Sequence, residues 1–312
     1  MAVLVGGATY VTTLGAALIF VGILLQSFLG ADQQQLLRAD LNPQKSSQDI
    51  VGDLKPHPID LAKHIIRNTV FPASGTLKSY LETLPTEFSY DLLKLGGQST
   101  LLDAGCGEAY FAEQYVALTS DIEQQRILIG PVLMNFKALL SKPSFQRAKT
   151  VAVDLKIRRT GIPSYGGRLK ILTGRFFEEI PIEDIGPTDL ITDLFGVFAY
   201  SPRVDDVLRR YFSLLKNQGT LYIFFGDEKE NYGLKSFIEK QGGKIPLIEW
   251  VRRIPGLQVT TLKGSGGGRT AGISLKIQIK NRPDILVPEL NLWHISDKHS
   301  GPPIRTYKLK IE

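Results

Sequence analysis

The chain has 312 residues, of which 43% are hydrophobic and 22% charged, and its formal net charge at pH 7 is +6. This composition provides enough apolar material for a sizeable core and excludes general disorder. The single cysteine, Cys106, excludes a disulfide within the chain and a zinc site built from several cysteines. The positive charge suits an anionic membrane surface or a nucleic acid, but the basic residues are scattered, so it favours neither partner.

The first 31 residues contain no charged side chain, and Ala2–Leu29 is mostly apolar. A helix of about 20 such residues spans a bilayer, so we predict a membrane anchor over residues 1–31. Arg38, Lys45 and Lys55 follow it, and the side richer in Lys and Arg stays cytoplasmic, which places the body of a single-pass protein in the cytoplasm. A cleaved signal peptide is the alternative, although the segment lacks a basic start and is long for that role.

Residues 32–56 are polar and are predicted to form a linker, and residues 57–95 are predicted to be N-terminal helices. The apolar spacing over Pro58–Phe71 predicts one helix. A second helical stretch covers Thr76–Leu95 and is predicted to break at Pro85. We expect these helices to cover the edge of a sheet that follows.

After Ser99, short apolar runs alternate with longer amphipathic stretches, which predicts an α/β domain with a parallel sheet. The runs are Thr100–Ala104, Thr150–Val153, Leu169–Leu172, Asp189–Thr192 and Thr220–Phe225. The later runs Leu257–Leu262 and Ile273–Ile279 are separated by a glycine-rich segment, which predicts an antiparallel hairpin. Residues 281–312 are predicted to be a C-terminal tail that folds back over the sheet or touches the membrane.

The segment Ser99–Phe111 combines an apolar strand, an acid, a glycine-rich turn and the start of a helix. Glycine permits a sharp turn and lets a ligand lie against bare main chain, beside the positive end of the following helix. A dinucleotide-binding loop would have a third glycine where Tyr110 stands, and no lysine follows in the spacing of a phosphate-binding P-loop.

Asp103, Gly105 and Gly107, with Ala109 at the last small position, resemble motif I of class I S-adenosylmethionine-dependent methyltransferases. The resemblance extends over about residues 96–280. It implies a Rossmann-like, seven-stranded, mostly parallel sheet with a C-terminal antiparallel hairpin, and S-adenosylmethionine as the cofactor. The residues it implies for cofactor binding are Asp103, Ala104, Gly105, Cys106, Gly107, Asp154, Arg175 and Phe176.

Asp154 ends the second predicted strand, where the family's acid binds the two ribose hydroxyls of the cofactor. A carboxylate accepts two such hydrogen bonds at once. Asp154 follows Asp103 at roughly twice the separation usual in the family, which implies an insertion around residues 121–147, predicted to be helical at Val132–Leu140. The alternative is that Asp154 is a turn residue.

Arg175 stands where the family often has an acid that contacts the adenine amino group, which puts that contact in doubt. Phe176 or Phe177 is predicted to stack on the adenine ring or to belong to the core. Asp193 and Tyr200 follow the fourth strand, where they are candidates to orient or deprotonate the methyl acceptor. Helix capping and packing are the alternative roles for both.

The resemblance implies a methyltransferase that the predicted anchor would hold at the membrane, with a small molecule, a lipid or a membrane protein as its substrate. Neither a nucleic-acid substrate nor a metal is expected. Arg175 and the long spacing before Asp154 motivate an alternative, a non-catalytic binding or scaffold module that keeps the fold. A nucleotide-binding oxidoreductase is a further alternative, which the missing third glycine opposes.

Overall fold

The computed structural model describes residues 75–117, 126–129, 132–135, 148–227, 231–240, 242–264, 272–296 and 302–310. The predicted anchor, the linker and the helix predicted over Pro58–Phe71 lie outside the described residues. Within the described ranges, no helix combines the length and apolar character that crossing a bilayer requires.

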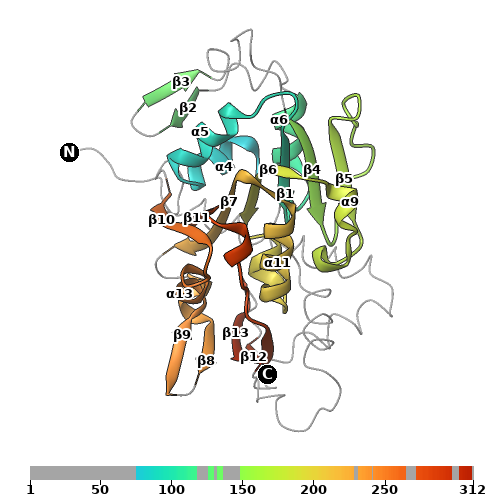
Figure 1. Cartoon of the computed structure of the whole chain (residues 1–312). Helices are drawn as coiled ribbons and strands as arrows, with labels where there is room; N and C mark the ends of the chain where they lie inside the picture. Colours follow the sequence, from blue (N-terminus) through green and yellow to red (C-terminus); the bar gives the residue numbers. More distant parts are fainter. Residues whose placement is uncertain are drawn as a thin grey trace, which may run out of the picture. The chain divides into compact units, whose positions relative to one another are not determined.

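A seven-stranded sheet forms the centre of the domain, in the order β10-β11-β7-β6-β1-β4-β5 (Figure 1). Its strands are β1 (Thr100–Ala104), β4 (Lys149–Asp154), β5 (Leu169–Thr173), β6 (Thr188–Leu194), β7 (Leu215–Asp227), β10 (Leu257–Lys263) and β11 (Gly272–Ile279). Strands β1, β4, β5, β6 and β7 run parallel to one another, and β11 is antiparallel to both β7 and β10. The predicted parallel sheet and C-terminal hairpin are therefore confirmed.

Three helices cover one face of this sheet: α4 (Leu77–Thr83), α5 (Thr86–Lys94) and α6 (Tyr110–Ala117). The predicted break falls between α4 and α5, where Pro85 caps the second helix. As the sequence predicts, the two helices reach the edge of the sheet: Leu262 of the edge strand β10 packs against their core cluster, and a Cβ atom on Gly264, directly after β10, would lie 2.4 Å from the carbonyl oxygen of Thr83. They also cover inner strands. Phe88 of α5 packs edge-on against Tyr222 of β7 with ring centroids 5.4 Å apart, and β7 is an inner strand.

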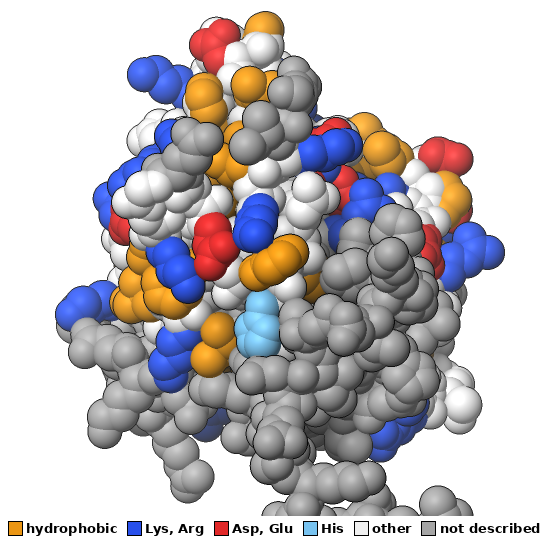
Figure 2. Space-filling model, turned by 90° about the horizontal axis from the view of Figure 1, so that it is seen from below, with side chains coloured by type: hydrophobic (Ala, Val, Ile, Leu, Met, Phe, Trp, Pro, Cys, Tyr) orange, Lys and Arg blue, Asp and Glu red, His pale blue; other side chains and the backbone are white. Residues whose placement is uncertain are grey.

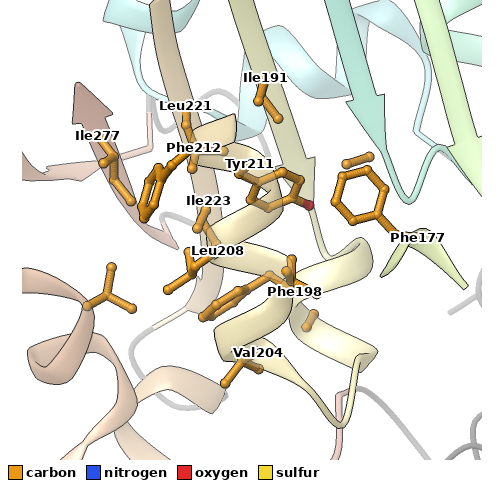
Figure 3. Packing of buried hydrophobic residues seen from close by; sticks show 14 of the residues in the cluster. Phe177, Ile191, Phe198, Val204, Leu208, Tyr211, Phe212, Leu221, Ile223 and Ile277 are labelled. Carbon is orange, nitrogen blue, oxygen red and sulfur yellow. The ribbon is translucent and has the colours of Figure 1, made fainter. Parts of the chain in front are cut away.

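The opposite face carries the 3-10 helix η1 (Phe177–Glu179) and the helices α9 (Ile182–Ile185), α10 (Val197–Tyr200), α11 (Val204–Leu214) and α13 (Leu247–Arg252). Figure 3 shows the core beneath them, where Phe177, Leu208 and Tyr211 meet Ile191 and Ile223 of the sheet. The side chain of Val207 is also fully buried on the inner side of α11. This apolar stripe fixes the helix against the sheet and so positions the loop that precedes it.

The predicted tail contributes two strands to a second sheet, of order β12-β13-β8-β9. The strands are β12 (Leu290–Ser296), β13 (Ile304–Leu309), β8 (Phe237–Lys240) and β9 (Gly243–Pro246); the short helices α12 (Tyr232–Lys235) and η2 (Arg282–Asp284) lie nearby in sequence. Seen from below (Figure 2), basic side chains among the described residues are interspersed with acidic and hydrophobic ones. The view agrees with the scattered basic residues of the sequence.

The insertion between β1 and β4 contains an antiparallel pair, β2 (Arg126–Ile129) and β3 (Val132–Asn135). The helix predicted over Val132–Leu140 is therefore wrong for its first four residues, and the rest of that range lies outside the described residues. Gly130-Pro131 separates two short apolar runs in the sequence, which is a turn signal that favours a hairpin over a helix.

Candidate functional site

A cleft of about 260 Å³ lies at the carboxyl ends of the parallel strands. Its walls come from α4 and from the turns after β1, β4, β5 and β6. The lining includes Tyr80 from α4, Gly105 and Gly107 after β1, Asp154 at the end of β4, Arg175 to Glu178 after β5, and Phe195, Gly196, Tyr200 and Ser201 after β6. Ligands bind at this end of open α/β sheets, so the cleft is the candidate site.

The glycine turn presents main chain to the cleft. Gly105 has φ +80°, and a Cβ atom there would lie 2.1 Å from the Cα of Gly196. The turn is tied to β4, because the N–H groups of Gly105 and Cys106 both donate to the carbonyl of Val153, at 2.7 and 3.0 Å. The predicted binding residues Ala104 and Cys106 are fully buried and do not line the cleft. Only a glycine suits position 105.

Asp154 lies at the cleft wall beside this turn. Its Oδ2 accepts the N–H of Gly107 at 2.8 Å, and its Oδ1 accepts the N–H of Lys156 at 2.9 Å. Burial raises the pKa of the Asp154 carboxyl, while these two backbone hydrogen bonds lower it. Each oxygen has a second lone pair, so the fixed carboxylate is able to accept a pair of hydroxyl groups from a ligand in the cleft.

Asp103 lies deeper and does not line the cleft. Its Oδ1 accepts the hydroxyl of Tyr80 at 3.0 Å, and its buried Oδ2 has no hydrogen-bond partner within the described part of the chain. Burial raises the pKa of Asp103 to about 8. Tyr80 itself lines the cleft and stacks on Phe111 with ring centroids 4.0 Å apart. The sequence motifs missed Tyr80, because it comes from α4, before the glycine loop.

The two candidate catalytic residues are placed differently. Asp193 is fully buried and does not line the cleft: its Oδ1 accepts the N–H of Gly196 at 2.8 Å, and its Oδ2 accepts the N–H of Phe198 at 2.7 Å and the hydroxyl of Tyr211 at 2.6 Å. Burial raises its pKa to about 6. These contacts favour the capping role over contact with a substrate. Tyr200 lines the cleft, and burial raises its pKa to about 12.

The segment after β5 brings one cation, two aromatic rings and an acid to the cleft: Arg175, Phe176, Phe177 and Glu178. Arg175 is exposed, whereas Phe176 and Phe177 are also part of the core cluster. Glu178 was not predicted. The only signal for it in the sequence is that it follows the glycine after β5 by four positions, close to where the family's acid is expected.

No protein-family model matches the chain, and no curated protein matches it significantly. The solved structures to which it is similar include an rRNA methylase from Streptococcus thermophilus (11% identity, 62% of this chain and 93% of that chain, TM-score 0.34), an O-methyltransferase from Bacillus cereus in complex with SAH (13%, 74% and 94%, 0.37), and a TehB-like SAM-dependent methyltransferase from Corynebacterium glutamicum (14%, 63% and 88%, 0.36). Five parallel strands and a C-terminal antiparallel hairpin give the chain the class I methyltransferase fold that motif I implies.

Proposed function

We propose that the protein is an S-adenosylmethionine-dependent methyltransferase. The observation that carries the proposal is the carboxylate of Asp154, which lies in the cleft and is held by the N–H of Gly107. In this arrangement an acid at the end of the second parallel strand lies beside a glycine turn that exposes main chain after the first parallel strand. Such an arrangement suits the binding of a ribose and of the group attached to it.

The residues present fit this cofactor. Gly105 and Gly107 provide main chain without side chains, Asp154 suits the ribose hydroxyls, and Phe176 and Phe177 provide an apolar wall for the adenine. When bound, S-adenosylmethionine supplies an electrophilic methyl group. The protein then has to align the acceptor with that methyl group and exclude water.

Calorimetry with S-adenosylmethionine and S-adenosylhomocysteine tests the first part of this proposal, and the expected result is that both bind. The second step is to incubate the protein and radiolabelled donor with membrane and soluble extracts, where one fraction is expected to become labelled. If neither ligand bound, the proposal would be refuted. If both bound and no fraction were labelled, the alternative of a non-catalytic module would be favoured; the exposed Arg175 in the cleft, in place of the usual acid, motivates that alternative.

The proposal includes a membrane anchor over residues 1–31, with the methyltransferase domain in the cytoplasm and a small molecule, a lipid or a membrane protein as the acceptor. The uncharged apolar stretch Ala2–Leu29 supports it. Alkaline washing of membranes should leave the full chain in the pellet and release a variant that lacks residues 1–31. Release of the full chain would contradict anchoring and leave the cofactor proposal unaffected.

A further inference from the structure

The cleft has two parts that differ in chemistry. The residues proposed to bind the methyl donor come from the turns after β1, β4 and β5, and the rest of the lining comes from α4, from the end of β6 and from the segment after it. The two parts meet at bare main chain, since a Cβ atom on Gly105 would lie 2.1 Å from the Cα of Gly196. With the methyl donor on the first part, the second is left for the methyl acceptor. This second part, the acceptor wall, includes Tyr80, Thr83, Leu194, Phe195, Val197 and Tyr200.

The acceptor wall is uncharged near neutral pH. The charged side chains among the described residues that line the cleft all come from the turns after β4 and β5: Asp154, Arg175 and Glu178. Oε2 of Glu178 is buried, and its Oε1 accepts the hydroxyl of Ser201. Burial raises the pKa of Tyr80 and raises that of Tyr200 to about 12, so both hydroxyls keep their protons. A charged group of the acceptor would therefore be buried here without a counter-ion, which is strongly unfavourable.

Phe195 is held at the acceptor wall in a strained backbone conformation. Its φ is +52°, in the left-handed region that bulky residues rarely adopt. Asp193 fixes the turn by accepting the N–H groups of Gly196 and Phe198. The ring of Phe195 packs edge-on against Phe224, with ring centroids 4.8 Å apart, and is still half-buried and part of the cleft lining. Glycine or asparagine adopts this backbone with less strain, so a phenyl ring at position 195 points to a role in binding.

A second ring reaches the acceptor wall from α4. Tyr80 stacks on Phe111 with ring centroids 4.0 Å apart, and its hydroxyl donates to Asp103. The ring is therefore fixed before any ligand binds, and it is the part of Tyr80 that is left to contact one. Phe195 packs against the same core cluster as Tyr80. Aromatic rings pack favourably on other rings, edge to face or offset, so this wall suits a planar aromatic ligand.

We propose that the methyl acceptor is an uncharged small molecule with an aromatic ring, which binds against Phe195 and Tyr80. The inference rests on the proposed methyltransferase function and narrows the class of acceptor within it. Leu194 and Val197 add aliphatic contacts beside the rings, which suits apolar substituents on the acceptor. A base within RNA would bring charged phosphates, to which the described part of the acceptor wall offers no basic side chain. A purely aliphatic acceptor would give no reason for a ring at the strained position 195.

Three ligands with the same carbon skeleton separate the effect of the ring from that of charge. The wild type, saturated with S-adenosylhomocysteine, is titrated by calorimetry with 2-naphthol, 2-naphthoate and decahydro-2-naphthol. The first is aromatic and neutral, the second is aromatic and anionic, and the third is neutral and saturated. 2-Naphthol should bind at least about tenfold more tightly than either of the others. This comparison needs no variant, so it does not depend on whether a variant folds.

Variants of Phe195 then locate the binding site. Phe195→Leu keeps an apolar side chain but removes the ring, so the affinity for 2-naphthol should fall by about tenfold. Its affinity for S-adenosylhomocysteine should stay close to that of the wild type, which also shows that the variant is folded. Phe195→Tyr restores a ring and should bind 2-naphthol more tightly than Phe195→Leu does. The matched control is Tyr90→Leu, at an exposed ring on α5 outside the cleft lining, and it should change neither affinity.

Several results would overturn the inference. They are a wild type, loaded with S-adenosylhomocysteine, that fails to bind 2-naphthol, and one that binds 2-naphthoate or decahydro-2-naphthol as tightly. Transfer of label from S-adenosylmethionine to RNA or to protein in the extracts, in place of a compound extractable into organic solvent, would also overturn it. A wild type that does not bind S-adenosylhomocysteine would refute the proposed function itself. That result is obtained before any acceptor ligand is added, so the two failures are told apart.

Discussion

The carboxylate of Asp154 accepts a 2.8 Å hydrogen bond from the N–H of Gly107 and so joins the end of β4 to the turn after β1. The two strands are direct neighbours in the sheet, paired in parallel from Thr100 to Ala104. The long insertion between them therefore leaves the geometry of the cleft intact, because strand pairing, and not distance along the chain, brings the acid to the glycine turn.

Replacing Asp154 with alanine should weaken the binding of both S-adenosylmethionine and S-adenosylhomocysteine by about 10- to 100-fold. The estimate corresponds to about 1.5–3 kcal/mol for hydrogen bonds to a charged group. Calorimetry measures the change, with Asp184→Ala as the control, at an acid on α9 that pairs with Lys170 at 3.3 Å. Unchanged affinity in Asp154→Ala would mean that the carboxylate only holds the turn.

Gly105→Ala should both destabilise the domain and abolish donor binding. The new Cβ atom would lie 2.1 Å from the Cα of Gly196, and the residue would keep φ near +80°. Gly161→Ala is a matched control, because that glycine has φ +72° but nothing within 4 Å of the added atom. The control should lose about 1–2 kcal/mol of unfolding free energy from backbone strain alone, and Gly105→Ala clearly more. Equal losses in urea unfolding would rule out the close contact.

The main sheet could be predicted from the sequence because its signals are local. Each parallel strand is a short apolar run, and the acid and glycines after β1 mark where the strand ends. Asp154 could be placed for the same reason, as the last residue of such a run. The actual role of Asp193 could not be predicted, because an acid at the end of β6 suits two roles equally: accepting the N–H groups of Gly196 and Phe198, and contacting a substrate.

The second sheet and half of the cleft depend on contacts between distant parts of the chain. β13 pairs in parallel with β8, and Tyr80 reaches Asp103 from a helix that precedes the motif. Glu178 and Ser201 meet only because the turns after β5 and β6 converge. Neither periodicity nor spacing contains this information, so these residues were missed.

The stability of the domain should fall as pH rises from about 6 to 8, and Asp103→Asn should reduce that fall. Burial raises the pKa of Asp103 to about 8 in the folded state, against about 4 when unfolded. The folded state therefore binds the extra proton between these values, and the stability this provides is lost as pH rises through 8. The fall of the unfolding free energy with pH should therefore be less steep in Asp103→Asn than in the wild type, by up to about 1.4 kcal/mol per pH unit.

Asparagine is the suitable replacement because its Oδ1 still accepts the hydroxyl of Tyr80. Asp193, with its pKa raised to about 6, contributes in the same direction at lower pH and remains in both proteins. The difference between wild type and variant above pH 6 therefore reports Asp103. Identical pH slopes in urea titrations would show that the carboxyl of Asp103 is not protonated in the folded protein at neutral pH.

Arg305 should be among the most costly residues to replace, although it lies close to the C-terminus. Its side chain is fully buried and donates to the carbonyls of Phe198, at 3.1 Å, and Ser201, which flank Tyr200 at the cleft. Arg305→Met leaves both carbonyls without these donors, so the unfolding free energy should fall by about 3 kcal/mol or more.

The matched control is Arg253→Met, at an exposed position, which should change the unfolding free energy by less than about 0.5 kcal/mol. Arg305→Lys should fall between them, since an ammonium lacks the fork that reaches two carbonyls at once. A loss below about 1 kcal/mol for Arg305→Met in urea unfolding would show that the C-terminal strand does not hold the cleft loop in place.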